Sequence, residues 1–224
     1  MHALYLHGFG SGPLTAKGVA LGQRLAGAVS SYAIPDLEGG DFHSLTMDGI
    51  LARAENALAA IPNDGQPILL IGSSLGGYAA AQLAATGRAA RVAALLLIAP
   101  AFGFTTRWTE RLGPEAIAAW RREGSRLFYH FGAQREVPLG VGFYDSCLAL
   151  PELPAQAPVP VSIVHGREDE SVDHRFSVQY ATTRQRVDLH LVTGDHRLTD
   201  QRHETLIAWV ALDLLAAMAR TSAG

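Results

Sequence analysis

The stretch LLIGSSLGGYAA, residues 69–80, joins an apolar run to an alanine-rich run through two serines and three glycines. Its centre, GSSLG at 72–76, has the pattern G-x-S-x-G. In this pattern the flanking glycines make room for a tight strand-to-helix turn, which lifts the middle serine out of the sheet. The spacing therefore predicts that Ser74 is a nucleophile and that Ser73 is not. A plain glycine-rich turn without a catalytic role is the alternative interpretation.

A serine hydroxyl needs a histidine base within hydrogen-bond reach, and that histidine needs an acid to orient it. In enzymes with this turn, the acid and then the histidine follow the serine along the chain. Here HGREDESV (165–172) and GDHRLT (194–199) each come at the end of a late apolar run. Because parallel strands end at the same edge of a sheet, we expect Ser74, Asp169 and His196 to converge there.

The acid and the histidine both have competitors nearby. A histidine on a helix face is ordinarily a surface residue, so His196 in its loop is preferred as the base. Most acids in a loop such as 165–172 are simply solvated, and Asp169 is preferred as the acid on the motif's pattern. The alternatives are Glu168, Glu170 and Asp173 for the acid, and His203 for the base.

An oxyanion hole needs one backbone N–H from the residue after the nucleophile and a second from the loop after the first core strand. Leu75 fills the first position. The second loop, HGFGSGP at 7–13, is rich in glycine and places Phe9 to offer its N–H. His7 precedes the serine, so we interpret it as a residue that braces this loop and borders the substrate pocket; the same caution excludes His165 as the base.

Composition limits the remaining possibilities. The 224 residues are 48 % apolar and 17 % charged, which is typical of a globular chain, and a net charge of −3 argues against a nucleic-acid partner. One cysteine excludes an internal disulfide, and the nine histidines show no paired ligand spacing, so no metal site is expected. No apolar run reaches the roughly 20 residues of a membrane span, and the start MHALYLHGFG does not resemble a signal peptide. These features favour a cytoplasmic protein without membrane contact.

Short apolar runs alternate with amphipathic ones along the chain. This alternation, with strands that are apolar throughout, predicts a parallel sheet buried on both faces in one α/β domain spanning 1–224. The expected strands are 2–6, 31–34, 67–71, 92–98, 160–165 and 187–192, and the expected helices lie near 14–28, 46–60, 75–87, 173–183 and 200–219.

Residues 100–159 exceed a simple crossover helix and carry many aromatic and arginine side chains. Long insertions in compact domains are usually functional or disordered, and the aromatic content argues against disorder. We expect an ordered lid over the Ser74 pocket, with Trp108 and Trp120 as pocket candidates on two short helices broken near Gly113. A helical pair that simply covers the sheet edge is the alternative.

The four segments LYLHGF, GSSLGGY, HGREDESV and GDHRLT, in this order, resemble the α/β-hydrolase superfamily, and more closely its small bacterial esterases of the YqiA type. The resemblance implies a single-domain α/β-hydrolase fold with a six-stranded, mostly parallel sheet and a lid-like insertion between strands 4 and 5. It implies a serine hydrolase that cleaves esters or thioesters through an acyl-enzyme and needs no cofactor. The segment 100–159 departs from that group, so the substrate is the least transferable part.

Two other functions remain open. The same triad would serve a serine peptidase or amidase, and a non-catalytic ligand-binding protein is compatible with the fold, although such a protein would be expected to lack one triad member. The expected partner is a small-molecule ester or thioester, with no nucleic acid and no membrane. The acyl chain length, the leaving group and the oligomeric state are not determined by the sequence.

Overall fold

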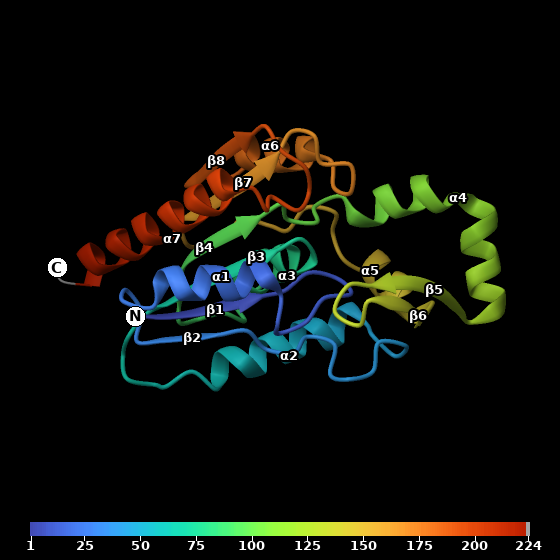
Figure 1. The fold of residues 1–224 in the computed structure, drawn as a ribbon, viewed down its shortest axis with the longest axis horizontal. Helices are drawn as coiled ribbons and strands as arrows, with labels where there is room; N and C mark the ends of the chain where they lie inside the picture. The colour runs from blue at the N-terminus through green and yellow to red at the C-terminus, as the bar shows by residue number, and fades with distance from the viewer. Residues whose placement is uncertain (223–224) are drawn as a thin grey trace.

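A six-stranded sheet forms the centre of the molecule, in a computed structural model that describes residues 1–222 (Figure 1). Every neighbouring pair of strands in it is parallel. The predicted α/β class and all six predicted strands are confirmed. In spatial order the strands are β2 (Ser31–Ala33), β1 (His2–Leu6), β3 (Ile68–Ser73), β4 (Val92–Ile98), β7 (Val161–Gly166) and β8 (Val187–Val192).

Helices cover both faces of this sheet, which explains why its central strands are apolar throughout. On β1, Leu4 and Leu6 pack into one core and Ala3 and Tyr5 into the other. The first core takes side chains from α2 (Met47–Ala59), α3 (Leu75–Ala85) and α6 (His174–Thr183). The second takes side chains from α1 (Ala16–Leu25) and α7 (Gln201–Ser222).

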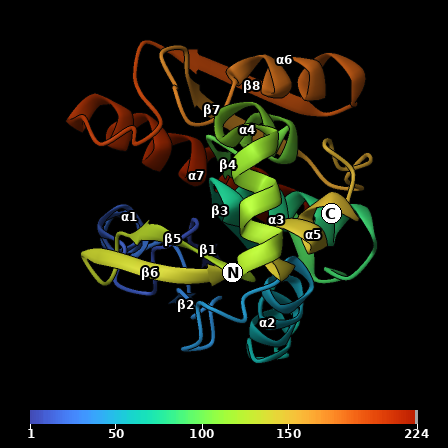
Figure 2. The same ribbon diagram turned by 90° about the vertical axis from the view of Figure 1, so that its right-hand side faces the viewer.

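An insertion leaves the sheet after β4 and returns at β7, its neighbour in the sheet. Figures 1 and 2 show it at the carboxyl ends of the strands, on the side of the molecule that Figure 2 faces. It consists of α4 (Phe104–Glu123), β5 (Ser125–His130), β6 (Arg135–Gly140) and α5 (Gly142–Leu148). Gly113 has non-helical angles (φ 76°, ψ 161°) and interrupts α4, as the sequence predicts.

The antiparallel hairpin of β5 and β6 was not predicted from the sequence. Its tip lies against the loop that follows β1: Gly132 N–H donates to the Gly10 carbonyl at 3.1 Å. A Cβ at Gly132 would lie 2.5 Å from the Ser11 carbonyl oxygen, so the two backbones are in direct contact. At the other end, Gly140 N–H donates to the His43 carbonyl at 2.9 Å. The insertion is therefore attached directly to the loop after β1.

An aromatic cluster joins the insertion to the same loop. The Phe9 ring lies 5.4 Å from Trp108, 6.0 Å from Phe128 and 5.3 Å from Phe143, measured between centroids. Trp108 stacks on Phe128 at 5.0 Å, and the centroids of Trp108 and Trp120 are 6.0 Å apart. Because aromatic pairs of this kind contribute beyond their buried area, the cluster holds the Phe9 backbone in a defined position.

Candidate active site

Ser74 lies on a sharp turn between β3 and α3, with φ 54° and ψ −118°. A non-glycine residue at positive φ has a strained backbone, and this conformation persists only where the surrounding structure enforces it. Here the Ser74 N–H donates to the Ile98 carbonyl at 2.9 Å, and its own carbonyl accepts from the N–H of Gly77 at 2.9 Å. The turn places the Ser74 hydroxyl beyond the carboxyl end of the sheet, next to the first turn of a helix.

The two glycines of the motif allow close contacts that no side chain would permit. A Cβ at Gly72 would lie 2.3 Å from the Gly76 carbonyl oxygen, and a Cβ at Gly76 would lie 2.2 Å from the Leu6 carbonyl oxygen. Both obstacles are backbone atoms, which cannot move aside as a flexible side chain does. The tightness of the turn and its contact with β1 therefore both depend on glycine.

Replacing Gly76 with alanine is expected to destabilise the fold by about 3 kcal/mol or more, because α3 must move away from β1. For a chain of this size that loss corresponds to a fall in Tm of about 6–12 °C. Gly142→Ala is the matched control, because a Cβ there meets nothing within 4 Å. A Gly76→Ala variant that melts at the temperature of the Gly142→Ala variant would contradict the close contact.

The structure brings Ser74, Asp169 and His196 together, although they lie on three different loops. Ser74 Oγ is 3.0 Å from His196 Nε2, and His196 Nδ1 is 2.7 Å from Asp169 Oδ2. The Asp169 side chain is fully buried, whereas the His196 side chain is 25 % exposed. The histidine is therefore within hydrogen-bond reach of both partners and still open on one side.

Backbone contacts between the loops after β7 and β8 set the positions of the acid and the histidine. Glu168 N–H donates to the Gly194 carbonyl at 3.0 Å, and the Gly194 N–H donates in return to the Glu168 carboxylate. A Cβ at Gly166 would lie 2.2 Å from the Gly194 carbonyl oxygen. Asp169 and His196 thus come from two loops that are held together independently of their own side chains.

The competing acids and the competing histidine have other partners. Glu168 binds the Gly194 N–H, and Asp173 caps α6 through the Arg175 N–H at 2.9 Å. His203 Nε2 donates to the Thr193 carbonyl at 2.8 Å. Glu170 contributes its backbone carbonyl to a 3.0 Å hydrogen bond from Arg107 of the insertion. In residues 1–222 none of these four side chains hydrogen-bonds to Ser74 or His196.

Four donors converge on the Asp169 carboxylate. Oδ1 accepts from the N–H groups of Ser171 and Val172, both at 2.8 Å, and Oδ2 accepts from His165 and His196. Burial acts to raise the pKa of Asp169, but the hydrogen bonds from the two histidines and the backbone hold that pKa well below its usual range. The carboxylate is therefore ionised and accepts hydrogen bonds only.

The predicted oxyanion-hole residues lie beside Ser74. A Cβ built on Gly8 would lie 3.2 Å from Ser74 Cβ and 3.8 Å from Ser74 Oγ, so the loop after β1 lies directly beside Ser74. Among the described residues, the N–H groups of Phe9 and Leu75 have no hydrogen-bond acceptor. Leu75 also begins α3, whose amino-terminal dipole favours negative charge nearby.

His7 holds the loop after β1 against the segment after β2. It is 2 % exposed, its Nδ1 contacts the Gly8 carbonyl at 2.9 Å, and its Nε2 accepts from the Leu37 N–H at 3.1 Å. Burial lowers its pKa, and an acceptor at Nε2 requires the neutral ring. In residues 1–222 His7 makes no hydrogen bond to Ser74, and it borders a small cavity with Phe9 and Leu75.

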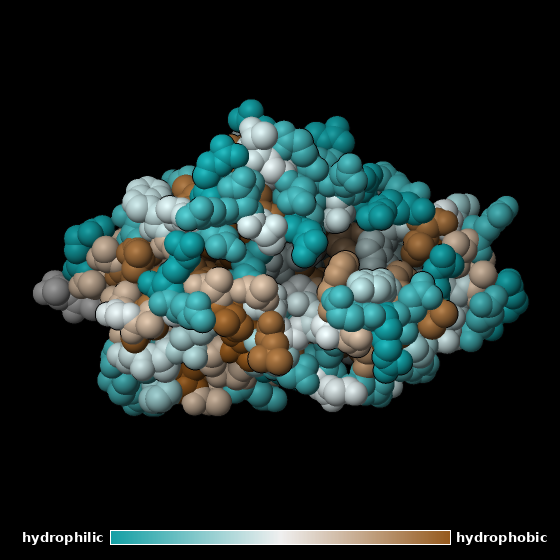
Figure 3. Space-filling model, viewed as in Figure 1, coloured by the Kyte–Doolittle hydropathy of each residue, from teal (hydrophilic) through white to brown (hydrophobic). Residues whose placement is uncertain are grey.

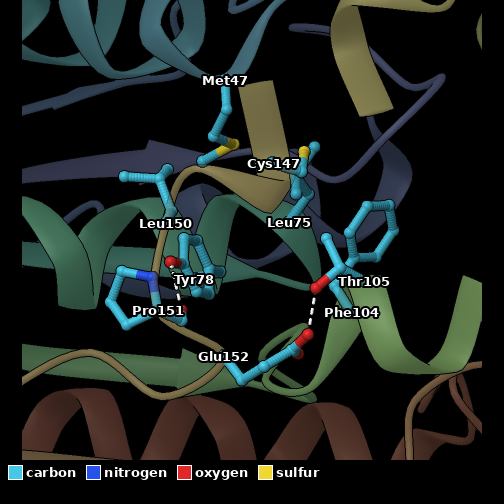
Figure 4. Close-up of a pocket in the computed structure, with 9 residues that line it drawn as sticks. All are labelled: Met47, Leu75, Tyr78, Phe104, Thr105, Cys147, Leu150, Pro151 and Glu152. Carbon is cyan, nitrogen blue, oxygen red and sulfur yellow. Dashed lines mark hydrogen bonds between the residues drawn. The ribbon is translucent and has the colours of Figure 1, made fainter. Parts of the chain in front are cut away.

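A second cavity, of about 20 Å³, also borders Leu75 (Figure 4). That volume holds about one water-sized group. Tyr78 donates its hydroxyl to the Pro151 carbonyl at 2.6 Å, and Thr105 donates to Glu152 at the far end. The remaining lining is apolar. The residues that line it are Met47, Leu75, Tyr78, Phe104, Thr105, Cys147, Leu150, Pro151 and Glu152.

The two tryptophans proposed for the pocket line neither of these cavities. Trp120 is 1 % exposed, and its indole N–H donates to the Leu139 carbonyl at 2.9 Å. Trp108 is half-buried between Phe104 and Phe128. Phe104 and Leu150, which sequence analysis did not single out, line the larger cavity instead. Figure 3 shows a hollow, with apolar residues in it, where the insertion meets the sheet.

Two further sequence expectations concern metals and membranes. Within residues 1–222, no group of three or more histidine, cysteine, aspartate or glutamate side chains is arranged to hold a metal ion. None of the helices in that range is both long enough and apolar enough to cross a bilayer.

A parallel sheet of this order, with a serine on the turn after its central strand, defines the α/β-hydrolase fold. The chain belongs to the uncharacterised protein family UPF0227, whose model matches residues 2–211. The resemblance to the α/β hydrolases and to the YqiA-type group is thereby confirmed. No curated protein sequence matches the chain.

Solved structures agree with this assignment. The chain is similar to alpha/beta hydrolase domain-containing protein 10 from mouse, with a TM-score of 0.82, 23 % identity and coverage of 97 % of this chain and 90 % of that one. It is also similar to an alpha/beta superfamily protein from Xanthomonas campestris pv. campestris, with a TM-score of 0.64, 27 % identity and coverage of 96 % and 98 %. A third similar structure is the esterase domain of a Rhodothermus marinus protein, with a TM-score of 0.63, 21 % identity and coverage of 98 % and 86 %.

Proposed function

We propose that this protein is a serine hydrolase that cleaves small carboxylic esters or thioesters through an acyl-enzyme. The observation that carries the proposal is the continuous chain of hydrogen bonds from Ser74 Oγ through His196 to Asp169, at 3.0 and 2.7 Å. Such a chain activates a serine hydroxyl, which is otherwise a weak nucleophile at neutral pH. The esterase named among the similar structures has the same fold and adds support.

The ionised Asp169 accepts from His196 Nδ1, so the neutral ring presents an unprotonated Nε2 to Ser74. His196 takes the hydroxyl proton as Ser74 Oγ bonds to the substrate carbonyl carbon, and the N–H groups of Phe9 and Leu75 stabilise the oxyanion. The bond to the leaving group breaks as His196 returns that proton to the departing oxygen or sulfur. Water, activated by the same histidine, then releases the acid from Ser74.

Both cavities border Leu75, one of the two proposed oxyanion donors, so we propose that the substrate carbonyl binds beside them. At about 20 Å³ and about 10 Å³ the cavities admit a group of one or two carbons. A longer acyl chain requires displacement of Phe104, Met47 or Leu150. We propose that the insertion acts as a lid whose position sets the length of chain that is accepted.

A series of p-nitrophenyl esters tests this function. We expect hydrolysis of the acetate and propionate, with kcat/KM at least about tenfold lower for the octanoate, because the cavity has to be opened. Leu150→Ala is expected to narrow that difference, whereas Leu212→Ala, an exposed change on α7, leaves it as it is. Acetyl p-nitroanilide, run in parallel, separates an esterase from an amidase. A protein that hydrolyses none of these esters and does not react with a fluorophosphonate would overturn the proposed function.

A further inference from the structure

A second histidine, His165 at the end of β7, hydrogen-bonds to the same carboxylate oxygen as His196. His165 Nε2 lies 3.0 Å from Asp169 Oδ2, and His165 Nδ1 lies 2.8 Å from Ser177 Oγ on α6. His165, Asp169 and Ser177 are all buried, with the side chains of the first two at 0 % exposure. The serine mechanism above assigns no part to His165.

The protonation of this buried ring follows from its partners. Asp169 is an ionised carboxylate and accepts only, so His165 Nε2 carries a proton and donates it to Oδ2. Nδ1 hydrogen-bonds to the Ser177 hydroxyl, which can either donate or accept. Oδ2 thus receives one donor from His165 and one from His196, at 3.0 and 2.7 Å. Both histidines therefore hydrogen-bond to the same carboxylate oxygen.

We propose that His165 is a positioning residue that fixes the Asp169 carboxylate and moderates the basicity of His196. This inference rests on the proposed serine hydrolase. The hydrogen bond from His165 keeps Oδ2 directed at His196 and takes part of the charge that would otherwise stabilise the protonated His196 ring. Without that bond, Oδ2 attracts the proton of His196 more strongly, and the base is protonated at a higher pH.

Other charged groups surround this network and are the same in every variant compared. From α1, Lys17 interacts with Asp169 and Asp195, and burial lowers its pKa to about 8. From α6, the His174 ring lies 6.4 Å from the His165 ring. From the loop after β8 come Asp195 and Arg197, and the loop after β7 contributes Glu168. Because Lys17 titrates on the alkaline side, the acidic limb of the pH profile is the informative one.

The experiment compares three substitutions of His165 in the full chain, by the kcat/KM of p-nitrophenyl acetate hydrolysis as a function of pH. His165→Gln keeps an N–H at the position of Nε2. The shorter amide of His165→Asn can hydrogen-bond to Ser177 but does not reach Asp169. His165→Leu removes the hydrogen bonds to both residues. Active sites are counted with a fluorophosphonate, so that misfolded protein does not enter kcat. The series is repeated in a His174→Gln background, which removes that imidazole from every variant compared.

We expect the Gln variant to keep the wild-type midpoint of the acidic limb. The Asn and Leu variants are expected to raise that midpoint by about half a pH unit and to lower the plateau of kcat/KM by about tenfold. If the His165→Leu variant does not fold, the comparison of His165→Gln with His165→Asn still tests the inference. If the wild type is active and the Gln and Asn variants have the same midpoint, the inference about His165 is overturned and the proposed function stands. A merely structural role of His165 would change stability and not the midpoint. A wild type that neither hydrolyses the ester nor reacts with the fluorophosphonate would overturn the proposed function as well.

Discussion

Replacing Ser74 with alanine is expected to lower kcat for ester hydrolysis by about 10⁴ to 10⁶-fold, whereas Ser73→Ala retains most of the activity. The two serines are adjacent in sequence, but their surroundings differ. The Ser74 hydroxyl is 3.0 Å from His196 Nε2. The Ser73 side chain interacts instead with Tyr5, whose ring packs in the opposite core with α1 and α7. Only the Ser74 hydroxyl is within hydrogen-bond distance of a histidine that can remove its proton.

Kinetics with p-nitrophenyl acetate and mass spectrometry after fluorophosphonate labelling measure this difference. Ser73→Ala is the matched control, because it removes a neighbouring hydroxyl of the same kind. It should be labelled at Ser74 as the wild type is. A labelled Ser73, or an active Ser74→Ala variant, would show that the nucleophile has been assigned to the wrong serine.

The fold was predictable because its signals are local and repeated. Each strand of the sheet is a short apolar run followed by an amphipathic one, and a parallel sheet covered on both faces follows from that alternation. The convergence of Ser74, Asp169 and His196 was predictable for a related reason: each lies just after a strand, and parallel strands end at one edge. Tertiary detail was not needed for either conclusion.

The hairpin of the insertion was not predictable in the same way. β5 and β6 carry arginine, glutamate and proline, and half of their residues are exposed. Their stability comes from contact with the loop after β1, where Gly132 meets Gly10 and Ser11. Contacts between segments more than 100 residues apart leave no periodic trace in the sequence, which explains why only the helices of this segment were expected.

The role of His165 was missed for a different reason. It stands in a His-Gly pair like that of His7 and Gly8, and the caution applied to His7 was extended to it. Its spacing of four residues from Asp169 was visible, but only the fold of the turn after β7 brings Nε2 to within 3.0 Å of the carboxylate. Sequence analysis predicted Asp169 and His196, and only the packing around them shows the second histidine that hydrogen-bonds to the carboxylate.

His196→Ala is expected to be nearly as damaging as Ser74→Ala, and the double variant no worse than either. In the proposed mechanism Ser74 depends on His196 to remove its proton, and His196 acts in the first step only through Ser74, so the two side chains act as one unit. Residues that act as a unit show strongly non-additive losses. His203→Ala is the matched control, because that ring donates to the Thr193 carbonyl and should leave kcat within about threefold. The measurement is kcat for all four variants at the plateau of the pH profile. Losses that multiply in the double variant would mean that Ser74 and His196 act independently, and a larger loss in His203→Ala than in His196→Ala would move the base to α7.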